Sequence, residues 1–283
     1  MNDCTPDVSW PIPNIAEMLR RIGSCKPKFF DIMDLTQGYH QAPLSVTTKA
    51  YTAFITFSGV YEFTRLPFGP KRAPSYFQEV MATVVLVGSI YMICEMYLDD
   101  CSVFDDNNIE FVSRLGSVFE RFSNLYLKAN KCFFGFKEVE FVGKVLPEEG
   151  LKISRTKIQT VLDLPTVGKQ LKSFLGIVNY LRDFVGNHST IVKPLHDLIA
   201  NYGKTRKIVW TPETTAAFYE MKLQVSKCST MHFLSDTALI TLRTDASDYG
   251  VSGYLFQTVD GIDQPVAFFS KSLKKSQLCW SVI

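Results

Sequence analysis

The segment YLDD at residues 97–100 constrains the fold of this chain more than any other feature of its sequence. It stands between two apolar runs, residues 90–98 and 101–104, which predict two strands joined by a tight turn. Adjacent carboxylates on a turn between buried strands repel each other and lose hydration, and a divalent cation relieves that cost. The competing interpretation is a solvated hairpin tip, because turns in general favour Asp.

A further acid, Asp34, ends another predicted strand, residues 29–33, in the same part of the chain. If the two strands are neighbours, Asp34 and Asp99 project from one end of one sheet. Two carboxylates in that position can hold two Mg²⁺ ions about 3.5–4 Å apart, the arrangement that catalyses phosphoryl transfer.

The composition is that of a folded chain. Of the 283 residues 46% are hydrophobic, with only 16 Gly and 13 Pro, which excludes disordered, collagen-like and low-complexity proteins. At roughly 150 residues per domain, the length predicts about two domains. The net charge of +2 hides an asymmetry, because residues 144–227 hold 13 basic and 7 acidic side chains, whereas residues 1–143 hold 13 and 16.

The cysteines and the apolar runs indicate where such a chain resides. Its seven cysteines include no C-x-x-C pair, which fits neither a disulfide framework nor a zinc ribbon and predicts a reducing, intracellular, cytoplasmic location. The longest uncharged stretch, residues 80–94, is shorter than the ~20 residues of a membrane-spanning helix, so no membrane partner is expected. The N-terminus lacks a secretory signal pattern.

Apolar spacing predicts three segments. Residues 1–143 alternate between helices (around 15–22, 74–85 and 115–122) and strands (29–33, 51–57, 61–63, 91–98, 102–104, 133–136 and 139–142). Residues 144–235 are mostly helical, and Thr211-Pro212-Glu213 is a good helix start. Residues 236–283 begin with strands near 239–244, 251–257 and 266–269.

Several motifs follow one another in a recognisable order. They are FDIMDLTQGYHQ (30–41), LPFG (66–69) with Ala73, Pro74, Phe77 and Gln78, YLDD (97–100), NKC (130–132), FVG (141–143) with GL (150–151), SFLG (173–176) with NY (179–180), and TDAS (244–247). In number, order and spacing they resemble the reverse transcriptases of Ty3/gypsy-type long-terminal-repeat retrotransposons, and the resemblance covers nearly the whole chain.

This resemblance implies an α+β fold with three parts. Residues 1–143 would be a polymerase palm with an antiparallel sheet and packed helices, its fingers largely missing. Residues 144–235 would be a helical, basic thumb and connection, and residues 236–283 the truncated start of an RNase H-like domain with a partial mixed sheet. The implied activity is RNA-directed DNA polymerisation, in which two Mg²⁺ ions, or Mn²⁺ in their place, assist transfer of a deoxynucleotide onto a primer 3′-hydroxyl.

The resemblance also assigns roles within the palm. Asp34, Asp99 and Asp100 match the metal-binding catalytic acids, Asp100 being the less direct ligand, and Lys131 matches a lysine suspected of protonating pyrophosphate. Tyr39 matches the aromatic residue that crowds a ribose 2′-hydroxyl, and Gln41, Phe68 and Gly69 fall in the nucleotide-binding segments. Without the resemblance, each of these residues has a simpler structural interpretation. Tyr39 would be an aromatic residue at a strand edge, residues 67–69 a Pro-Phe-Gly turn, and Lys131 a solvated lysine.

Nucleic-acid contacts are implied for the basic middle of the chain. The turn with Phe141 and Gly143 resembles the hairpin that grips the primer end, and the thumb and connection would lie against phosphates of a hybrid duplex. The lysines and arginine expected there are Lys152, Arg155, Lys157, Lys169 and Lys172.

The third segment resembles the start of a ribonuclease H domain, with Asp245 as a vestigial first metal ligand. The next acid of that family would fall just beyond Ile283, so we expect no ribonuclease H activity.

The implied partners are an RNA or DNA template with its primer, deoxynucleoside triphosphates, and other polyprotein products such as a protease and an integrase, with virus-like particles as one setting. The family's triphosphate-clamping Lys and Arg precede the segment that matches residues 5–15. The alternative is therefore a catalytically dead or domesticated retrotransposon-derived fragment that binds nucleic acid without polymerising.

Overall fold

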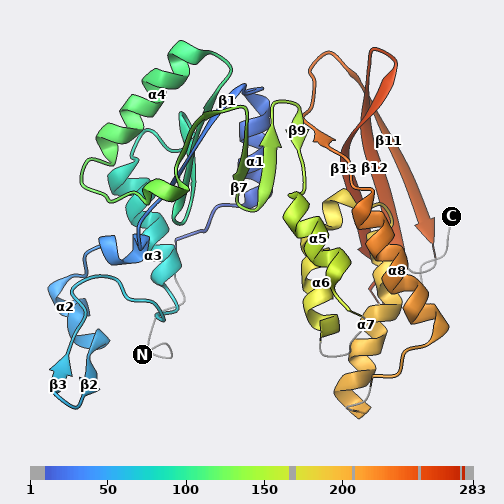
Figure 1. Cartoon of the computed structure of the whole chain (residues 1–283), viewed down its shortest axis with the longest axis horizontal. Coiled ribbons are helices and arrows are strands. Elements are labelled where there is room, and N and C mark those ends of the chain that lie inside the picture. Colours follow the sequence, from blue (N-terminus) through green and yellow to red (C-terminus); the bar gives the residue numbers. More distant parts are fainter. Residues whose placement is uncertain (1–9, 166–169, 206–207, 248–249, 275, 278–283) are drawn as a thin grey trace. The chain divides into compact units, whose positions relative to one another are not determined.

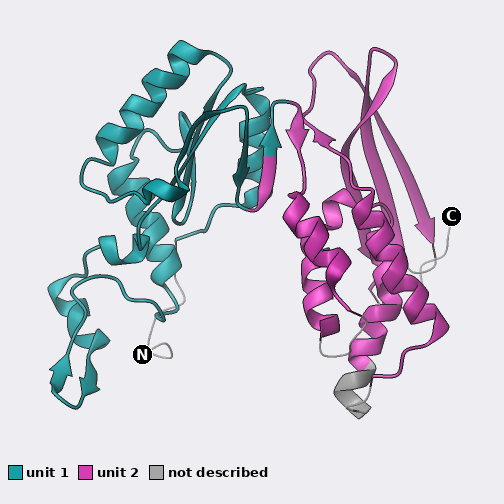
Figure 2. Cartoon of the chain, in the orientation of Figure 1, with its two compact units in different colours: residues 1–142, 146–148 teal, residues 143–145, 149–283 magenta. Residues whose placement is uncertain are grey.

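The chain forms two compact units in a computed structural model that describes residues 10–165, 170–205, 208–247, 250–274 and 276–277 (Figure 1). The first unit comprises residues 1–142 and 146–148, and the second comprises residues 143–145 and 149–283 (Figure 2). The two units alternate over residues 142–149. Residues 236–283 belong to the same unit as the helical segment before them, and the division into three domains stays a prediction.

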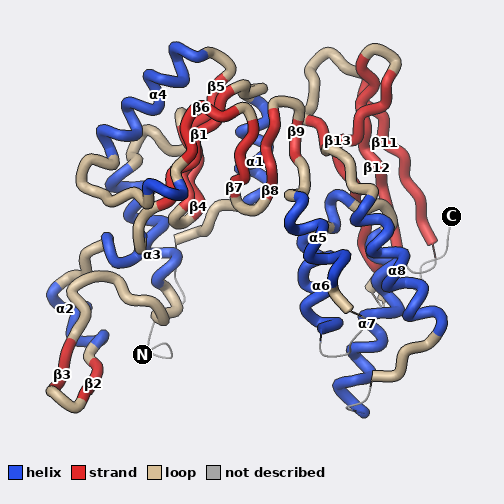
Figure 3. Tube along the Cα trace, viewed as in Figure 1, coloured by secondary structure: helices blue, strands red, loops and turns tan. Residues whose placement is uncertain are grey.

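The first unit is built on a four-stranded antiparallel sheet in the order β4-β5-β1-β6 (Figure 3). The strands are β1 (Phe29–Asp34), β4 (Cys94–Tyr97), β5 (Asp100–Asp105) and β6 (Phe133–Phe136). The register places Asp34 opposite Asp100 and Tyr97 opposite Asp100 on the other side. The sheet therefore brings together the two sequence segments that carry the acids.

Three helices accompany this sheet, namely α1 (Ile15–Ser24), α3 (Ala73–Val80) and α4 (Asn108–Arg121) (Figure 1). The Asn14 and Asn107 side chains cap the starts of α1 and α4, and Pro74 lies in the first turn of α3. Buried apolar side chains of α3, α4 and the sheet form one core. It includes Met33, Phe77, Met81, Met96, Cys101, Val103, Phe111 and Val118.

Two predicted strands of this unit are shorter in the structure. The strand predicted for residues 91–98 begins only at Cys94, because Tyr91 adopts a left-handed backbone (φ 69°) that a strand does not allow. The strand predicted for residues 51–57 is reduced to β2 (Phe54–Thr56), which pairs with β3 (Gly59–Tyr61). The short helix α2 (Val46–Lys49), capped by Ser45, occupies the chain just before it.

In its described residues, the second unit combines four α-helices with a three-stranded sheet. The helices are α5 (Arg155–Asp163), α6 (Leu171–Tyr180), α7 (His188–Thr205) and α8 (Pro212–Ser226), and their apolar faces share a core that includes Phe174, Leu195, Phe218 and Met221. Helix α8 begins at the predicted Thr211 cap, with a capping box. Helix α7 contains Pro194 and was not predicted.

The sheet of the second unit consists of β11 (Leu239–Ser247), β12 (Gly250–Val259) and β13 (Ile262–Ser272). All its pairings are antiparallel, so the mixed character that we expected of this segment does not occur in the described part. The described residues also form the short strands β7 (Glu138–Phe141), β8 (Lys144–Pro147), β9 (Gly150–Leu151) and β10 (Met231–His232). Among the described residues, every helix is too short or too polar to cross a membrane.

Strand β1 carries a fully buried acid, Asp31, within the core of the first unit. Its Oδ1 accepts a hydrogen bond from the Gly135 backbone N–H at 2.6 Å, and its Oδ2 has no hydrogen-bond partner. Burial raises the pKa of Asp31 to about 6, against the smaller opposing effect of the Gly135 hydrogen bond. The unfolded chain therefore ionises Asp31 at lower pH than the folded chain does.

We predict that this acid makes the protein less stable as pH rises from about 4 through about 6, because the folded state binds the proton more tightly. The Asp31→Asn variant should lose roughly 1 kcal/mol less stability than the unmodified protein over this pH range. This is below the ~1.4 kcal/mol per pKa unit expected for an unscreened group, because screening weakens the effect. Urea denaturation at pH 4.5 and 7.5 measures it. An unchanged difference between the two pH values in the variant would contradict the prediction.

Candidate active site

Three carboxylates lie at one end of the sheet of the first unit. Asp34 ends β1 directly opposite Asp100, and the pairing of Tyr97 with Asp100 leaves Leu98 and Asp99 as the two turn residues between β4 and β5. The Leu35 N–H donates a hydrogen bond to the Asp99 carbonyl at 3.1 Å, which ties the turn to the end of β1. This is the juxtaposition that the sequence led us to expect.

The acids influence one another electrostatically. The pKa of Asp99 is raised to about 6, first by burial and then by the charges of Asp100 and Asp34. Burial and the charge of Asp34 also raise the pKa of Asp100. Asp99 Oδ1 is buried and has no hydrogen-bond partner. The site therefore contains more negative charge than its protein surroundings compensate.

Lys131 supplies one positive charge to this cluster. Its Nζ lies 2.9 Å from Asp34 Oδ2, and this contact, more than the weaker effects of Asp100 and Asp99, raises the pKa of Lys131. The Lys128 N–H donates a hydrogen bond to the Asp34 carbonyl at 2.8 Å, which holds the short turn Ala129–Lys131 against the end of β1. Two residues of one segment thus fix the backbone and the side chain of Asp34.

The donor set fits a divalent cation in charge and in chemistry. Carboxylate oxygens are the ligands that Mg²⁺ prefers, and the buried Asp99 Oδ1 is an acceptor without a donor. In the part of the chain that the structure describes, no three His, Cys, Asp or Glu side chains converge closely enough to hold an ion as they stand. Here the Lys131 ammonium occupies one oxygen of Asp34, so a cation and this lysine compete for the same carboxylate.

Gln78 of α3 positions the turn that carries the acids. Its side chain is fully buried, its Oε1 accepts from the Leu98 N–H at 2.9 Å, and its Nε2 donates to the Met96 carbonyl at 3.2 Å. Leu98 has a left-handed backbone (φ 53°), a conformation that costs a residue with a side chain energy. The sequence motif contains Gln78, but nothing in the sequence indicated that it binds this backbone.

Gly38 allows Asp99 to approach the core. A Cβ at Gly38 would collide with Asp99 Oδ1 and crowd the Phe77 ring, so only glycine leaves room for both. The signal in the sequence was its place four residues after Asp34. We did not assign it a role.

Aromatic side chains form one wall of the site. The Tyr39 ring centroid lies 5.2 Å from that of Phe68 and 5.2 Å from that of Phe77. Burial, and then the charges of Asp99 and Tyr97, raise the pKa of Tyr39. Phe68 is 66% exposed, and Gly69 after it has a φ of 111°, a conformation that favours glycine. Tyr39 and Phe68 thus form one aromatic surface.

Three predicted site residues lie elsewhere. The Gln41 amide is bound to backbone, since Nε2 donates to the Thr36 and Tyr126 carbonyls and Oε1 accepts from the Tyr126 N–H. Phe141 is 1% exposed, so its ring packs in the interior and presents no surface to a ligand, and the nucleic-acid role that we predicted for this hairpin stays a prediction. Asp245 is exposed on β11 of the second unit, opposite Ser252.

The basic residues predicted to contact nucleic acid belong to the second unit. Lys152 forms an ion pair with Glu149 at 2.8 Å, Arg155 begins α5, and Lys172 is exposed on α6. Lys157 donates a hydrogen bond to the Gly143 carbonyl. Lys169 lies outside the described residues.

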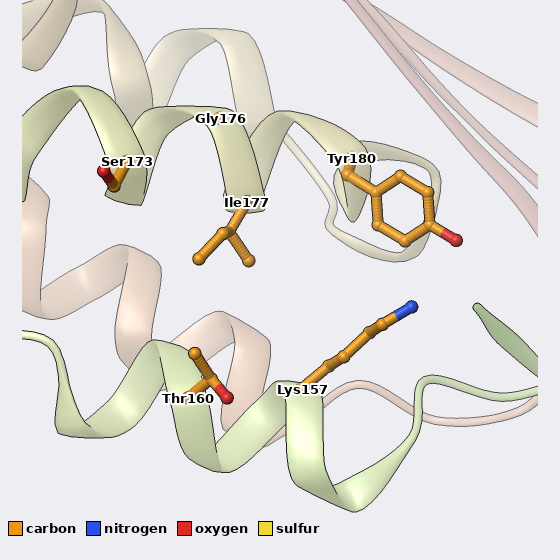
Figure 4. A pocket seen from close by; sticks show the side chains of 6 residues that line it. All are labelled: Lys157, Thr160, Ser173, Gly176, Ile177 and Tyr180. Carbon is orange, nitrogen blue, oxygen red and sulfur yellow. The ribbon is translucent and has the colours of Figure 1, made fainter. Parts of the chain in front are cut away.

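Helices α5 and α6 enclose an open, mostly apolar groove of about 440 Å³, with Lys157 and Tyr180 near one end (Figure 4). Ser173, Gly176 and Ile177 of α6 and Thr160 of α5 also line it.

An antiparallel sheet with three acids at one end, one of them on a two-residue turn, is the arrangement of a polymerase palm. Residues 2–146 match the family model described as reverse transcriptase (RNA-dependent DNA polymerase), and residues 210–283 match the RNase H-like domain found in reverse transcriptase. The chain belongs to the reverse transcriptase family. Members of this family in general depend on divalent metal ions.

Relatives with similar sequences are retrotransposon polyproteins. The chain is 33% identical to the retrovirus-related Pol polyprotein from transposon opus of Drosophila melanogaster, over 100% of this chain and 29% of that protein. It is 31% identical to the Pol polyprotein from transposon 297 of the same organism, over 100% and 26%. For the transposon Tf2-3 polyprotein of Schizosaccharomyces pombe the identity is 30%, over 96% and 20%. The chain therefore spans less than a third of these relatives.

Solved structures share the fold. A foamy viral protease-reverse transcriptase in complex with an RNA/DNA hybrid matches with a TM-score of 0.83 and 23% identity, over 99% of this chain and 38% of that one. The same kind of protein in complex with dsDNA matches with a TM-score of 0.80 and 22% identity, over 99% and 58%.

We predict that Gln78→Met weakens the hairpin between β4 and β5. The change leaves the Leu98 N–H and the Met96 carbonyl without their buried partner, which should lower the free energy of unfolding by about 2–3 kcal/mol. Hydrogen exchange of residues 94–105 under native conditions measures it. Gln159→Met is the control, because that exposed side chain donates a hydrogen bond to the side chain of Asp163 and not to a buried backbone group. Equal protection of residues 94–105 from hydrogen exchange in both variants would show that Gln78 does not stabilise this hairpin.

Proposed function

We propose that this chain is the polymerase core of a retrotransposon reverse transcriptase, which extends a primer with deoxynucleoside triphosphates on an RNA or DNA template. The observation that carries the proposal is the register that sets Asp34 opposite Asp100 and next to the Asp99 turn. The fold of the foamy viral enzyme and the names of the retrotransposon relatives support it.

In this proposal Asp34 and Asp99 hold two Mg²⁺ ions, with Asp100 as the less direct ligand. When bound, the ions supply Lewis acidity that activates the primer 3′-hydroxyl and neutralises charge on the leaving pyrophosphate. Asp99 must be ionised to act as a ligand, so its proton, held by the raised pKa of about 6, competes with cation binding as pH falls. The relief of carboxylate repulsion favours cation binding.

Lys131, Tyr39 and Phe68 would contact the nucleotide. Lys131, exposed and protonated beside Asp34, is placed to neutralise or protonate the pyrophosphate once an ion takes over its carboxylate. Tyr39 and Phe68 would border the sugar and base, and Tyr39 would exclude a ribose 2′-hydroxyl by its bulk. Gln41 would contribute indirectly, because its amide fixes the backbone next to Tyr39.

We predict primer extension on an RNA template in the presence of Mg²⁺, and a loss of at least about 100-fold in Asp99→Asn, since the amide cannot replace a charged metal ligand. Extension of a labelled DNA primer, resolved by length, measures it. Asp31→Asn is the matched control, because that acid lies on the same strand as Asp34 but in the core. Extension by the Asp99→Asn variant at the unmodified rate would refute the proposal. If the chain binds an RNA·DNA hybrid but does not extend the primer, it is the alternative named above, a fragment that binds nucleic acid without polymerising.

Mg²⁺ should also stabilise the protein in the absence of nucleic acid. For a dissociation constant near 1 mM, 10 mM Mg²⁺ adds about 1.4 kcal/mol to the free energy of unfolding. Thermal denaturation with and without the ion should show a rise in Tm for the unmodified protein and for Asp31→Asn, but none for Asp99→Asn. An equal rise in all three proteins would locate the ion elsewhere.

A further inference from the structure

His40 stands in the sequence motif around Asp34, and the proposed function assigns it no role. It belongs to the short helical turn Gly38–Gln41, and its side chain is half-buried. The ring centroids of His40 and Phe68 lie 5.1 Å apart, with an interplanar angle of 85°. Aromatic pairs favour this edge-to-face arrangement, because the positive edge of one ring meets the negative face of the other.

Phe68 therefore has aromatic neighbours on two consecutive residues of one turn. The Tyr39 ring lies 5.2 Å from it at an interplanar angle of 36°, and the His40 ring approaches it edge-on. Tyr39 also contacts Phe77, whose side chain is 1% exposed, so Tyr39 is anchored on the core. Phe68 is 66% exposed, and exposed side chains ordinarily exchange between rotamers. The two ring contacts restrict that exchange.

The turn and the segment that carries Phe68 are also joined by hydrogen bonds. The Leu66 N–H donates to the Ala42 carbonyl at 3.0 Å, and Arg65 Nη1 donates to the Gln41 carbonyl at 2.8 Å. Neither bond involves an aromatic ring. The loss of the His40 ring should therefore leave the backbone of both segments in place and act on the Phe68 side chain alone.

The other end of the same turn touches the acid cluster. A Cβ at Gly38 would collide with Asp99 Oδ1, whereas His40, two residues later, contacts Phe68. The backbone of Gln37 before the turn is left-handed (φ 48°), and its carbonyl accepts a hydrogen bond from the His40 N–H at 2.8 Å. One short turn thus links the position of Phe68 to that of Asp99.

We propose that His40 is a positioning residue of the nucleotide site, whose ring holds Phe68 in the orientation in which Phe68 packs against the incoming nucleotide. The proposal deepens the proposed function and rests on it, because it takes a deoxynucleoside triphosphate as the ligand of this site. His40 acts through Phe68 and touches no reacting atom.

Preorganisation is the physical basis of this role. A side chain that becomes immobilised only when the ligand arrives weakens binding, whereas a side chain that the protein already holds does not. Loss of one aromatic pair should therefore weaken nucleotide binding by about 2- to 12-fold. The chemical step depends on the acids and their metal ions, which His40 does not contact in this proposal, so the rate of that step should change little.

The experiment is steady-state primer extension by the full chain, with the concentration of one deoxynucleoside triphosphate varied. His40→Ala should raise the KM for that nucleotide about 2- to 12-fold and leave kcat within about twofold. His40→Phe keeps an aromatic ring at this position and should restore the KM. A lower kcat at unchanged KM in His40→Ala would contradict the proposal.

A double-mutant cycle with Phe68→Ala shows whether His40 acts through Phe68. In the Phe68→Ala background, His40→Ala should change the KM by less than about twofold, because the ring that His40 positions is absent. An equal effect of His40→Ala in both backgrounds would overturn the proposal, since the imidazole would then act independently of Phe68.

A fluorine resonance at position 68 reports the orientation of the ring without any need for activity. 4-Fluorophenylalanine incorporated at this position alone gives one signal, whose chemical shift depends on the neighbouring rings. His40→Ala should move the signal toward its position in the urea-unfolded chain and narrow it, and His40→Phe should keep it away from that position. An identical signal in His40→Ala and in the protein with His40 would refute the positioning role.

His196→Ala is the matched control, because it removes an exposed histidine from α7 in the second unit. It should change neither the KM nor the fluorine signal. An equal rise in KM in His196→Ala and His40→Ala would show that the effect does not come from the contact with Phe68.

The outcomes separate this proposal from the proposed function. Primer extension with independent effects of His40→Ala and Phe68→Ala removes the role of His40 and leaves the polymerase in place. If the unmodified chain does not extend a primer, the proposed function is wrong, and the role of His40 in nucleotide binding is wrong with it.

Discussion

The repulsion between the carboxylates of Asp34, Asp99 and Asp100 is the interaction on which the rest of the first unit depends. Antiparallel pairing of β1 with β5 places two of these acids opposite each other, and the turn adds the third. Burial and mutual repulsion raise the pKa of Asp99 to about 6, so the arrangement persists only because surrounding groups fix it. Sites that keep like charges close together, at a cost in stability, are common where those charges bind a ligand.

The groups that hold these acids in place are Gln78, Gly38 and Lys131. Gln78 satisfies the backbone of the turn, Gly38 leaves space for Asp99, and Lys131 neutralises part of the charge at Asp34. Each acts from a different element, since α3, the segment after β1 and the turn before β6 all meet at this end of the sheet. The geometry of the acids is therefore a property of the whole first unit, which agrees with the reverse transcriptase family model matching residues 2–146 as one piece.

In the second unit, two positively charged side chains lie close together. Lys144 and Lys157 are brought to one tyrosine ring, and the Val142 and Gly143 backbone angles show a turn held away from its relaxed geometry. Clustered carboxylates fit a divalent cation, and ammonium groups fit a phosphate. A polymerase requires both kinds of group, because its reaction uses bound metal ions and a polyanionic substrate.

The sequence by itself determined which residues carry the acids, where β1, β5 and α8 lie, and the family, because strand periodicity, helix caps and motif order are local properties of the chain. It could not distinguish Gln41, which binds backbone, from a residue that faces substrate, nor the buried Phe141 from one that contacts nucleic acid. It also gave no sign that Lys144 would be buried. Those outcomes depend on which distant segments pack around each side chain, and only the tertiary structure decides that.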